Sequence, residues 1–309
     1  MRKKFYVLIA AMSLSVMLLG GCGNTNNNNS ATSPETSDAP GDNNGAGDNN
    51  NNNNNNGTND NGGVVVMMAA MFLSADAADK EKHYELKVGD FSQLVVDDSF
   101  NVEYRSDNDK AGLAEFSTTP QIADKIIFEN NKKGKLTLQK AFYEGEEMRI
   151  GLPTITVYSR FLKEVKNCGD STVRAIDMRP TIELKAVVIG NGRLVMRNIE
   201  CSKFDGSIKT GNGTLVVEGK CEDAVLSNTG TGAIQADNLE AKNVSCHFFG
   251  TGTTGCWATD ELKVKGVMAG KLYYRNKPER IRNYSMGVKI YSLDGKEWTG
   301  EEAAPSESE

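Results

Sequence analysis

Residues 190–252 read GNGRLVMRNIECSKFDGSIKTGNGTLVVEGKCEDAVLSNTGTGAIQADNLEAKNVSCHFFGTG, and the motif Gly-x-Gly returns in this stretch at a nearly fixed spacing. The copies begin at Gly190, Gly211, Gly230 and Gly250, with a weaker one at Gly169. From the first to the last, the spacings are 21, 21, 19 and 20 residues. A period near 20 residues is typical of solenoids, in which each repeat stacks only on its neighbours.

The residues between the glycines indicate β-strands. Apolar and polar side chains alternate after each motif, as at Leu194 and Met196, and this period of two marks a strand with one buried face. A coil of about 20 residues at roughly 3.3 Å per residue traces about 66 Å, enough to circle a packed core once. The sequence therefore predicts an all-β fold, a parallel β-helix in which equivalent residues of successive coils stack about 4.8 Å apart.

Aligning the coils places equivalent residues in columns. The predicted columns are Cys201–Cys221–Ala241, Ala224–Val244–Val264, Leu226–Cys246 and Ile199–Gly219–Leu239. The motif glycines are assigned to corners, where a positive φ or the close approach of successive backbones excludes a Cβ. These structural corner glycines are Gly169, Gly190, Gly192, Gly211, Gly213, Gly230, Gly232, Gly250 and Gly252.

Before the coils, the chain alternates strands and turns from Tyr84 to Tyr158, which predicts a less regular N-terminal β part. Pro120 to Asp124 is expected to form a single helical turn. Five cysteines lie in the repeat region, with two of them in one column. Side chains in one column of a parallel stack point the same way and stand farther apart than a disulfide prefers, so we expect buried thiols rather than a disulfide scaffold.

Several stretches, in this order, resemble one known family. They are FSQLVVDDSFNV at 91–102, GKLTL at 134–138, PTITV at 153–157, the Gly-x-Gly coils, and KLYYRNKP at 271–278. Together they are similar to the head GIN domain, also called the putative auto-transporter adhesin family of bacterial envelope proteins. The resemblance covers about residues 84–293 and implies a right-handed β-helix-like fold. It offers no catalytic residue. This chain departs from the family in having Asn or Thr between the glycines where Ser is usual, Asn276 where a closing Gly is usual, and the five cysteines.

The first residues are typical of an export signal. Arg2, Lys3 and Lys4 precede an apolar run from Phe5 to Leu19. The run ends in LLGGC at 18–22, which resembles the lipobox of bacterial lipoproteins. We therefore expect residues 1–21 to be a signal peptide and Cys22 to carry the lipid that binds the protein to a membrane. An ordinary secretory peptide is the alternative, while a spanning helix would need about 20 apolar residues.

The stretch 22–63 is dominated by Asn, with too few apolar side chains to build a core, and is expected to be a disordered tether. Val64 to Leu73 then supplies ten apolar residues within a cap or linker segment at 64–82. That run is interpreted as a cap over the open end of the solenoid, with an interfacial anchor or partner contact as the alternative. The folded domain is expected at 83–294, followed by a flexible acidic tail at 295–309.

The pattern of charge disfavours nucleic acid as a partner. The chain has a net charge of −6, with 35 basic and 41 acidic residues. Removal of the signal peptide takes three basic residues, leaving 32 against 41 and a net charge of −9. Such a chain is repelled by phosphate backbones and, taken as a whole, by anionic membrane surfaces.

No catalytic, metal or cofactor site is predicted. The two histidines, His83 and His247, have no Cys or Asp at zinc-ligand spacing. Cys246 and His247 cannot form a dyad, because neighbours on a strand point to opposite faces. The carboxylates Asp170, Asp177, Asp205 and Asp237 occupy different coil positions, and the adjacent Asp260 and Glu261 diverge, so no acid pair of a polysaccharide-cleaving enzyme is expected.

These observations favour a non-enzymatic, lipid-anchored module of the cell envelope for surface binding or adhesion. Its ligand is expected to be a glycan or a protein at the cell surface. The anchor is expected in the outer membrane, on the periplasmic or the surface-exposed side. The alternatives are a structural or stress-related envelope protein and, less favoured, a β-helix enzyme that cleaves polysaccharides.

Overall fold

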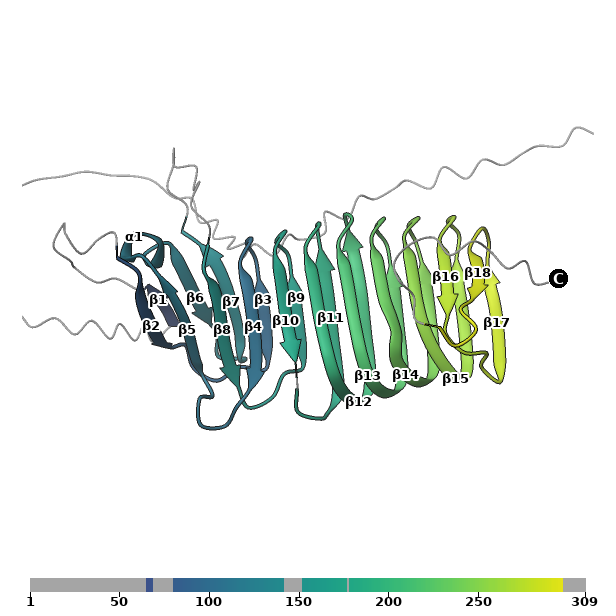
Figure 1. Cartoon of the computed structure of the whole chain (residues 1–309), viewed down its shortest axis with the longest axis horizontal. Helices are drawn as coiled ribbons and strands as arrows, with labels where there is room; N and C mark the ends of the chain where they lie inside the picture. Colours follow the sequence, from purple (N-terminus) through teal and green to yellow (C-terminus); the bar gives the residue numbers. More distant parts are fainter. Residues whose placement is uncertain (1–64, 69–79, 142–151, 177, 297–309) are drawn as a thin grey trace, which may run out of the picture. The chain divides into compact units, whose positions relative to one another are not determined.

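The structure, a computed structural model, describes residues 65–68, 80–141, 152–176 and 178–296. All of these residues belong to one compact unit, residues 53–309. Within the described ranges the chain forms strands and one helical turn (Figure 1). None of its helical residues makes a segment long and apolar enough to cross a membrane.

The N-terminal part contains β1 (Val65–Met68), β2 (Lys82–Lys87), β3 (Gln93–Val96), β4 (Asn101–Ser106), β5 (Leu113–Thr118), α1 (Pro120–Ala123), β6 (Ile126–Asn130) and β7 (Lys135–Lys140). The coils that follow contain β8 (Thr154–Ser159), β9 (Glu164–Asn167), β10 (Thr172–Ile176), β11 (Thr181–Ile189), β12 (Arg193–Thr210), β13 (Thr214–Asn228), β14 (Ala233–Phe248), β15 (Thr253–Gly266), β16 (Lys271–Tyr274), β17 (Arg280–Ser285) and β18 (Lys289–Ser292). The helical turn α1 confirms the one predicted at residues 120–124.

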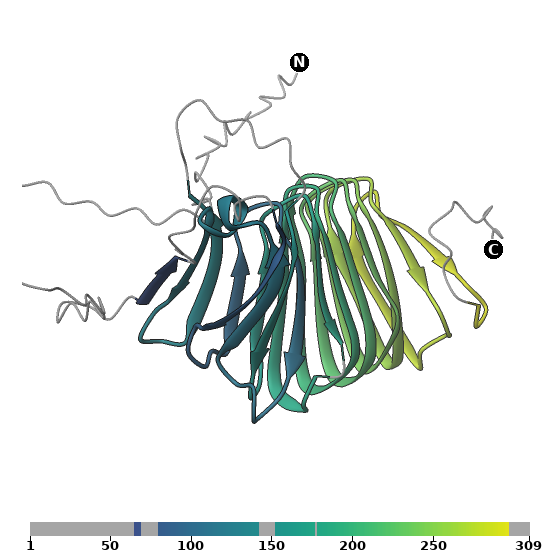
Figure 2. The ribbon, with the colours of Figure 1, turned by 60° about the vertical axis from the view of Figure 1, so that its left-hand side comes forward.

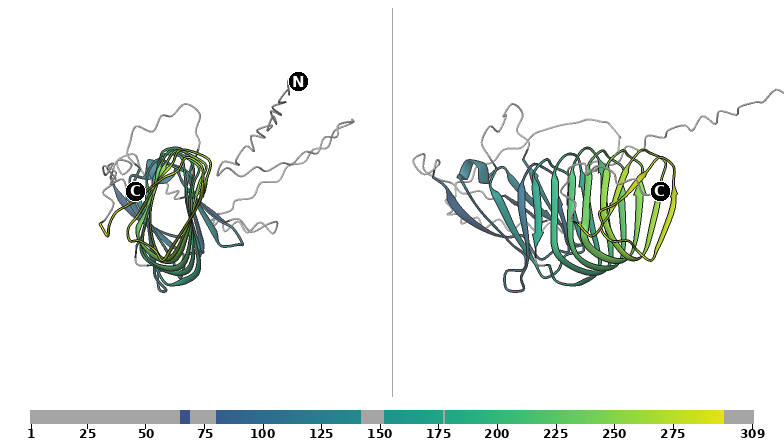
Figure 3. Two further views of the ribbon diagram at one scale, coloured as in Figure 1. Left: turned by 90° about the vertical axis from the view of Figure 1, so that its right-hand side faces the viewer. Right: turned by 45° about the vertical axis from the view of Figure 1, so that its right-hand side comes forward.

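Parallel pairing builds a solenoid of about six turns, which confirms the predicted fold class. One face, here called face A, runs in the order β8, β4, β10, the first halves of β12 to β15, β16 and β18. The opposite face B runs in the order β7, β3, β9, β11, the second halves of β12 to β15, and β17. Viewed along the stack, the coils superimpose as closed loops (Figure 3, left).

The N-terminal end is irregular, as predicted, because its outer strands pair in the antiparallel sense. On the side of face A, β2 pairs with β5 and β5 with β8. On the side of face B, β1 pairs with β6 and β6 with β7. Strand β1 belongs to the apolar segment proposed as a cap, and it is the outermost strand at this edge (Figure 2). The other residues of that apolar run, 64 and 69–73, lie outside the described residues.

Most of the predicted register is confirmed. Cys201 pairs with Cys221 and Cys221 with Ala241, and the columns Ile199–Gly219–Leu239 and Leu226–Cys246 also form. The column Ala224–Val244–Val264 is wrong in its last member, because Val244 pairs with Leu262 and Val264 pairs with Cys246. The cause is the bend of β15, which takes fewer residues than the bend of β14. Register shifts between Ala236 and Glu240, and between Ala241 and Asn243, absorb the difference.

The Gly-x-Gly motifs form the corner where the chain passes from face B to face A. Gly190 and Gly211 have φ of 94° and 79°, a region that L-residues with side chains rarely adopt. At Gly213, Gly230 and Gly252 the φ is not positive, but an added Cβ would collide with a glycine carbonyl of the previous coil. These corners are therefore restricted to glycine by stacking as well as by backbone conformation.

Two buried asparagines complete these corners, and the sequence reading missed their role. The Asn228 side chain donates from Nδ2 to the carbonyl oxygens of Gly232 at 3.0 Å and Thr253 at 3.2 Å. Asn167 makes the equivalent pair of bonds to Ser171 and Arg193. Corner carbonyls that face the interior are thereby satisfied without water.

The core holds free thiols, as predicted for four of the five cysteines. Cys201, Cys246 and Cys256 are buried and Cys221 is partly buried, and all four are free. A hydrogen bond with its stacked neighbour Cys201, and then burial, raise the pKa of the Cys221 thiol well above its usual range. Cys168 departs from the prediction, because it is disulfide-bonded. It is partly buried, as Cys221 is, and lies at the corner after β9 and not in the core columns.

Candidate ligand cleft

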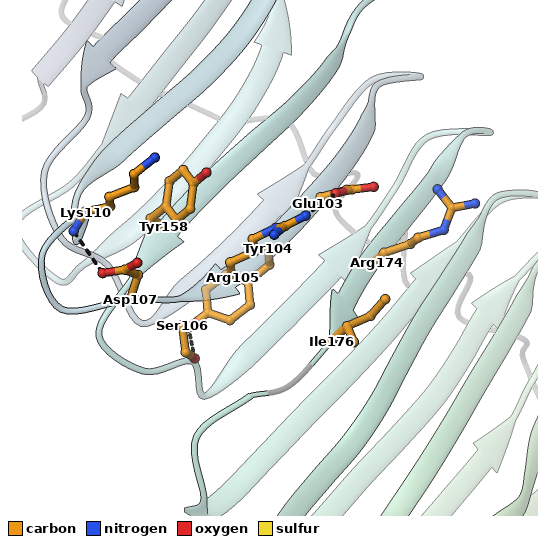
Figure 4. Close-up of a pocket in the computed structure, with 9 residues that line it drawn as sticks. All are labelled: Glu103, Tyr104, Arg105, Ser106, Asp107, Lys110, Tyr158, Arg174 and Ile176. Atoms are coloured by element: carbon orange, nitrogen blue, oxygen red, sulfur yellow. Dashed lines mark hydrogen bonds and ion pairs between the residues drawn. The ribbon is translucent and has the colours of Figure 1, made fainter.

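A cleft of about 460 Å³ opens on face A where the irregular part meets the first regular coils. Its floor is made by β8, β4 and β10, which lie side by side in parallel although they are far apart in the sequence. Outward side chains of these strands meet in register, Tyr158 beside Arg105 and Glu103 beside Arg174. Figure 4 shows Tyr158, Arg105 and Arg174 arranged across this floor, with Ile176 at its lower edge.

The loop after β4 forms one wall of the cleft. The Asp107 carboxylate accepts hydrogen bonds from the backbone N–H groups of Asp109 at 2.8 Å and Lys110 at 3.1 Å. These two bonds hold the pKa of Asp107 below its usual range. Arg179 supports the same loop through a 2.5 Å bond to the side-chain oxygen of Asn108. Asp107 therefore acts as the fixed acceptor of a turn and not as an acid.

Tyr158 is held in place by a charged partner behind it. Its hydroxyl donates to Glu115 at 2.8 Å, and Lys110 donates to the other oxygen of the same carboxylate at 2.7 Å. The Lys110 ammonium also lies 4.9 Å from the centre of the Tyr158 ring. The hydrogen bond from Lys110 is the main cause that holds the pKa of Glu115 below its usual range. The aromatic ring is thus pre-oriented at the edge of the cleft.

Tyr104 closes the bottom of the cleft from inside the core. Its ring is 1% exposed, and its hydroxyl lies 3.0 Å from the hydroxyls of both Ser106 and Ser159. Burial raises the pKa of the Tyr104 hydroxyl above its usual range, so the group stays protonated. It contributes a neutral hydrogen-bonding atom at the base of the site.

The cationic side chains of the cleft differ in whether they form ion pairs with nearby carboxylates. Arg105 lies 3.3 Å from Glu103, and Lys110 is paired with Glu115. Arg174 makes no ion pair with any residue in the described ranges, and its side chain is exposed. A planar guanidinium of this kind suits a carboxylate or sulfate group, which it can bind through two parallel hydrogen bonds.

The described residues that line the cleft lack the paired carboxyl groups of a glycosidase. Hydrolysis of a glycosidic bond generally needs two carboxyl groups, one of them with a raised pKa. In the cleft, Asp107 has a lowered pKa and Glu103 is ion-paired with Arg105. The described part of the chain contains no group of three His, Cys, Asp or Glu side chains able to hold a metal ion.

The other residues weighed in the sequence lie elsewhere and apart from one another. His83 lies 3.4 Å from Ser117 on the N-terminal strands. His247 is partly buried on the outside of face B, while Cys246 beneath it is fully buried, so the two point apart. Partial burial, and then the charge of Lys265, lower the pKa of His247.

The acidic residues are also dispersed. Asp170 accepts from the backbone of Asn191 at a corner, and Asp205 lines a second groove on face B. Asp260 accepts from the Thr259 hydroxyl, whereas Glu261 forms ion pairs with three cations. Asp237 is buried, and Asp177 lies outside the described residues.

Comparison with known proteins identifies the family. The model of the family described as "Putative auto-transporter adhesin, head GIN domain" matches residues 90–278. The chain belongs to the head GIN domain family. The match begins at β3 and ends after β16, so it contains the cleft and the corner glycines together. No curated protein matches the chain.

Several solved structures share this fold. A putative adhesin from Bacteroides fragilis superimposes with a TM-score of 0.62 at 22% identity, covering 70% of this chain and 98% of that one. A putative lipid binding protein from Parabacteroides distasonis gives 0.55 at 19% identity, covering 69% and 97%. A putative adhesin from Parabacteroides merdae gives 0.54 at 19% identity, covering 70% and 97%. At these identities the likeness establishes the fold of the head GIN chain and nothing finer.

Proposed function

We propose that this head GIN protein is a non-enzymatic binding module of the cell envelope, anchored by lipid at Cys22, whose cleft on face A holds an acidic glycan. The observation that carries the proposal is the exposed Arg174 guanidinium, which makes no ion pair with any described residue and lies across the cleft from the fixed ring of Tyr158. Tyr158 is 8% exposed and Lys110 lies over one face of its ring, so the ring offers a small ordered apolar surface to the edge of a sugar, while the Arg174 guanidinium binds the carboxylate or sulfate. The family description, which names an adhesin head domain, agrees with a role at the surface.

The cleft favours binding over turnover. A ligand there meets the ordered edge of an aromatic ring and the cations of the cleft. It meets no carboxyl group with a raised pKa in the described residues that line the cleft. A glycan-cleaving enzyme and a purely structural envelope protein remain the competing functions, and they differ from a binder in measurable ways.

The test uses the mature chain from residue 22 with Cys22→Ser, incubated with immobilised neutral and acidic glycans. A binder retains acidic glycans and leaves them intact. The variant Arg174→Gln should lower this affinity about tenfold or more, the usual cost of one charge-assisted pair. Arg193→Gln, which removes an exposed arginine from the next coil of the same face, is the matched control and should bind as the parent does. Released oligosaccharide would indicate an enzyme, and no retention of any glycan would reject the proposal.

A further inference from the structure

The last coils of the solenoid carry a concentration of positive charge. Residues 263–296 contain nine basic and two acidic side chains, a net charge of +7 within a chain of net charge −6. The remainder of the chain therefore carries −13. Because charges are screened beyond about 8–10 Å at physiological ionic strength, the surface near this end is governed by the local excess and not by the net charge.

Part of this excess forms a compact cationic grid on the outside of face B. Lys263 stacks beside Arg282, and Arg280 stacks beside Glu261, through the parallel pairing of β15 with β17. Glu261 lies within ion-pair distance of Lys263, Arg280 and Arg282, at 2.5, 3.5 and 2.8 Å. Lys265, exposed two residues beyond Lys263 on the same strand, adds a fourth cation to this one carboxylate. The grid keeps a net charge of +3.

An exposed apolar ridge borders the grid. The corner residues Phe249, Val267, Met268 and Met286 are 61%, 68%, 42% and 75% exposed. They stack in successive coils, as shown by the backbone bond from Met286 to the carbonyl of Gly266. In the coils before them the same corner is polar, with Asn191, Asn212, Thr229 and Thr231. The corner thus becomes apolar only where the neighbouring face becomes basic.

The two features lie side by side on one surface. Alternate residues of a strand project from the same face, so Lys265 points outward two positions before the corner residue Val267. In the next coil Tyr284, 60% exposed, precedes Met286 in the same way. The result is a row of apolar and aromatic side chains flanked by cations, the arrangement by which proteins bind the interface of an anionic bilayer.

We propose that this end patch, the ridge Phe249, Val267, Met268 and Met286 with its adjoining cations, docks the domain on an anionic membrane surface. The cations would bind lipid phosphates while the ridge enters the headgroup region. A polyanionic glycan would satisfy the cations but leaves the ridge without a role. A symmetric contact with a second copy would oppose two grids of charge +3. The proposal is independent of the cleft and of the lipid expected at Cys22.

The test measures cosedimentation of the mature chain, from residue 22 with Cys22→Ser, with vesicles. One set contains phosphatidylcholine alone and the other contains equal parts of phosphatidylcholine and phosphatidylglycerol. We expect binding to the anionic vesicles only, weakened by salt. The charge variant Lys263→Gln/Lys265→Gln/Arg282→Gln should lower the partition coefficient roughly a hundredfold, since each cation near an anionic surface contributes about a fivefold factor. The ridge variant Phe249→Ser/Met286→Ser should also reduce binding.

The matched controls remove an exposed lysine and an exposed apolar residue away from the patch, as Lys203→Gln and Ile182→Ser, and should bind as the parent does. Unchanged circular dichroism and melting temperature show that each variant is folded. Binding that is equal in all variants would overturn the proposal, as would no binding to anionic vesicles. Retention on immobilised heparin that persists in the ridge variant, without vesicle binding, would overturn it in favour of a polyanion site. A dimer in sedimentation velocity that only the ridge variant abolishes would overturn it in favour of self-association.

Discussion

Gly211 lies so close above Gly190 that a Cβ on Gly211 would be 2.6 Å from the carbonyl carbon of Gly190. Gly211 also has a φ of 79°, so two independent restrictions act on one residue. A β-branched side chain there must distort its own backbone and push two coils apart. The corner is consequently the place where the stack is most sensitive to substitution.

We therefore expect Gly211→Val to lower the free energy of unfolding by about 1–3 kcal/mol or more, the range for a side chain forced into a left-handed backbone. Thr214→Val, at a partly exposed position three residues later, is the control and should change it by well under about 1 kcal/mol. Urea denaturation of both variants measures the difference. Equal shifts would contradict the structural role of the corner.

The repeat could be predicted from sequence because its determinants are local. Glycine spacing and period-two alternation specify coils, corners and three of the four columns tested. The fourth failed at Val264, since the bend of β15 between Cys256 and Val264 is shorter than the bend of β14 between Ala236 and Cys246, and this changes the register without leaving a glycine or proline as a signal. Bulges of this kind depend on packing around the bend, which no single stretch of sequence reveals.

The cleft was not foreseen, for a different reason. Its floor joins β8, β4 and β10 in an order that is not the chain order, so Tyr158, Arg105 and Arg174 come together only in the folded stack. The alternation of strands and turns in this part was predicted, but the use of the turn after β4 as a wall of the cleft was not. The end patch was not predicted because the sequence was assessed by its net charge of −6, which does not show the local excess of basic residues from Lys263 onward.

The Glu115 carboxylate gives the wall of the cleft a dependence on pH. Its pKa in the folded protein is lowered from 4.5, first by the hydrogen bond from Lys110 and then by that from Tyr158. The stabilisation is therefore fully present above the unfolded value and is lost as the pH falls through the lower folded value. The melting temperature of the parent should exceed that of Glu115→Gln at neutral pH, and the two should converge as the pH falls below 4.5 and through the lower folded pKa. Glu200→Gln, an exposed change at the distant bend of β12, is the control and should match the parent at neutral pH as well as in acid.

The free thiols of the core supply a further measurement. Cys201, Cys221, Cys246 and Cys256 are free, and Cys168 is disulfide-bonded. Protein made without the signal peptide and unfolded without reductant should therefore release four thiols to a colorimetric reagent. A count of no free thiols would show that the stacked Cys201 and Cys221, and the pair Cys246 and Cys256, had also been oxidised. That result would contradict the hydrogen-bonded thiols of the core.

The sequence contains only one other cysteine, Cys22, so the same measurement bears on the proposed lipid anchor. A lipidated cysteine is a thioether and cannot form a disulfide. In chain extracted from membranes of the native cell, Cys168 should then be a fifth free thiol, whereas the unlipidated chain should give four. Cys22→Ser should either leave the precursor unprocessed or shift the protein into the soluble fraction. A precursor that keeps its signal peptide migrates more slowly on a gel than a chain that has lost it. Two results together would reject lipidation: four thiols in the membrane-extracted protein, and unchanged gel mobility and fractionation of Cys22→Ser. The end patch would then be the remaining proposed contact of the domain with a membrane.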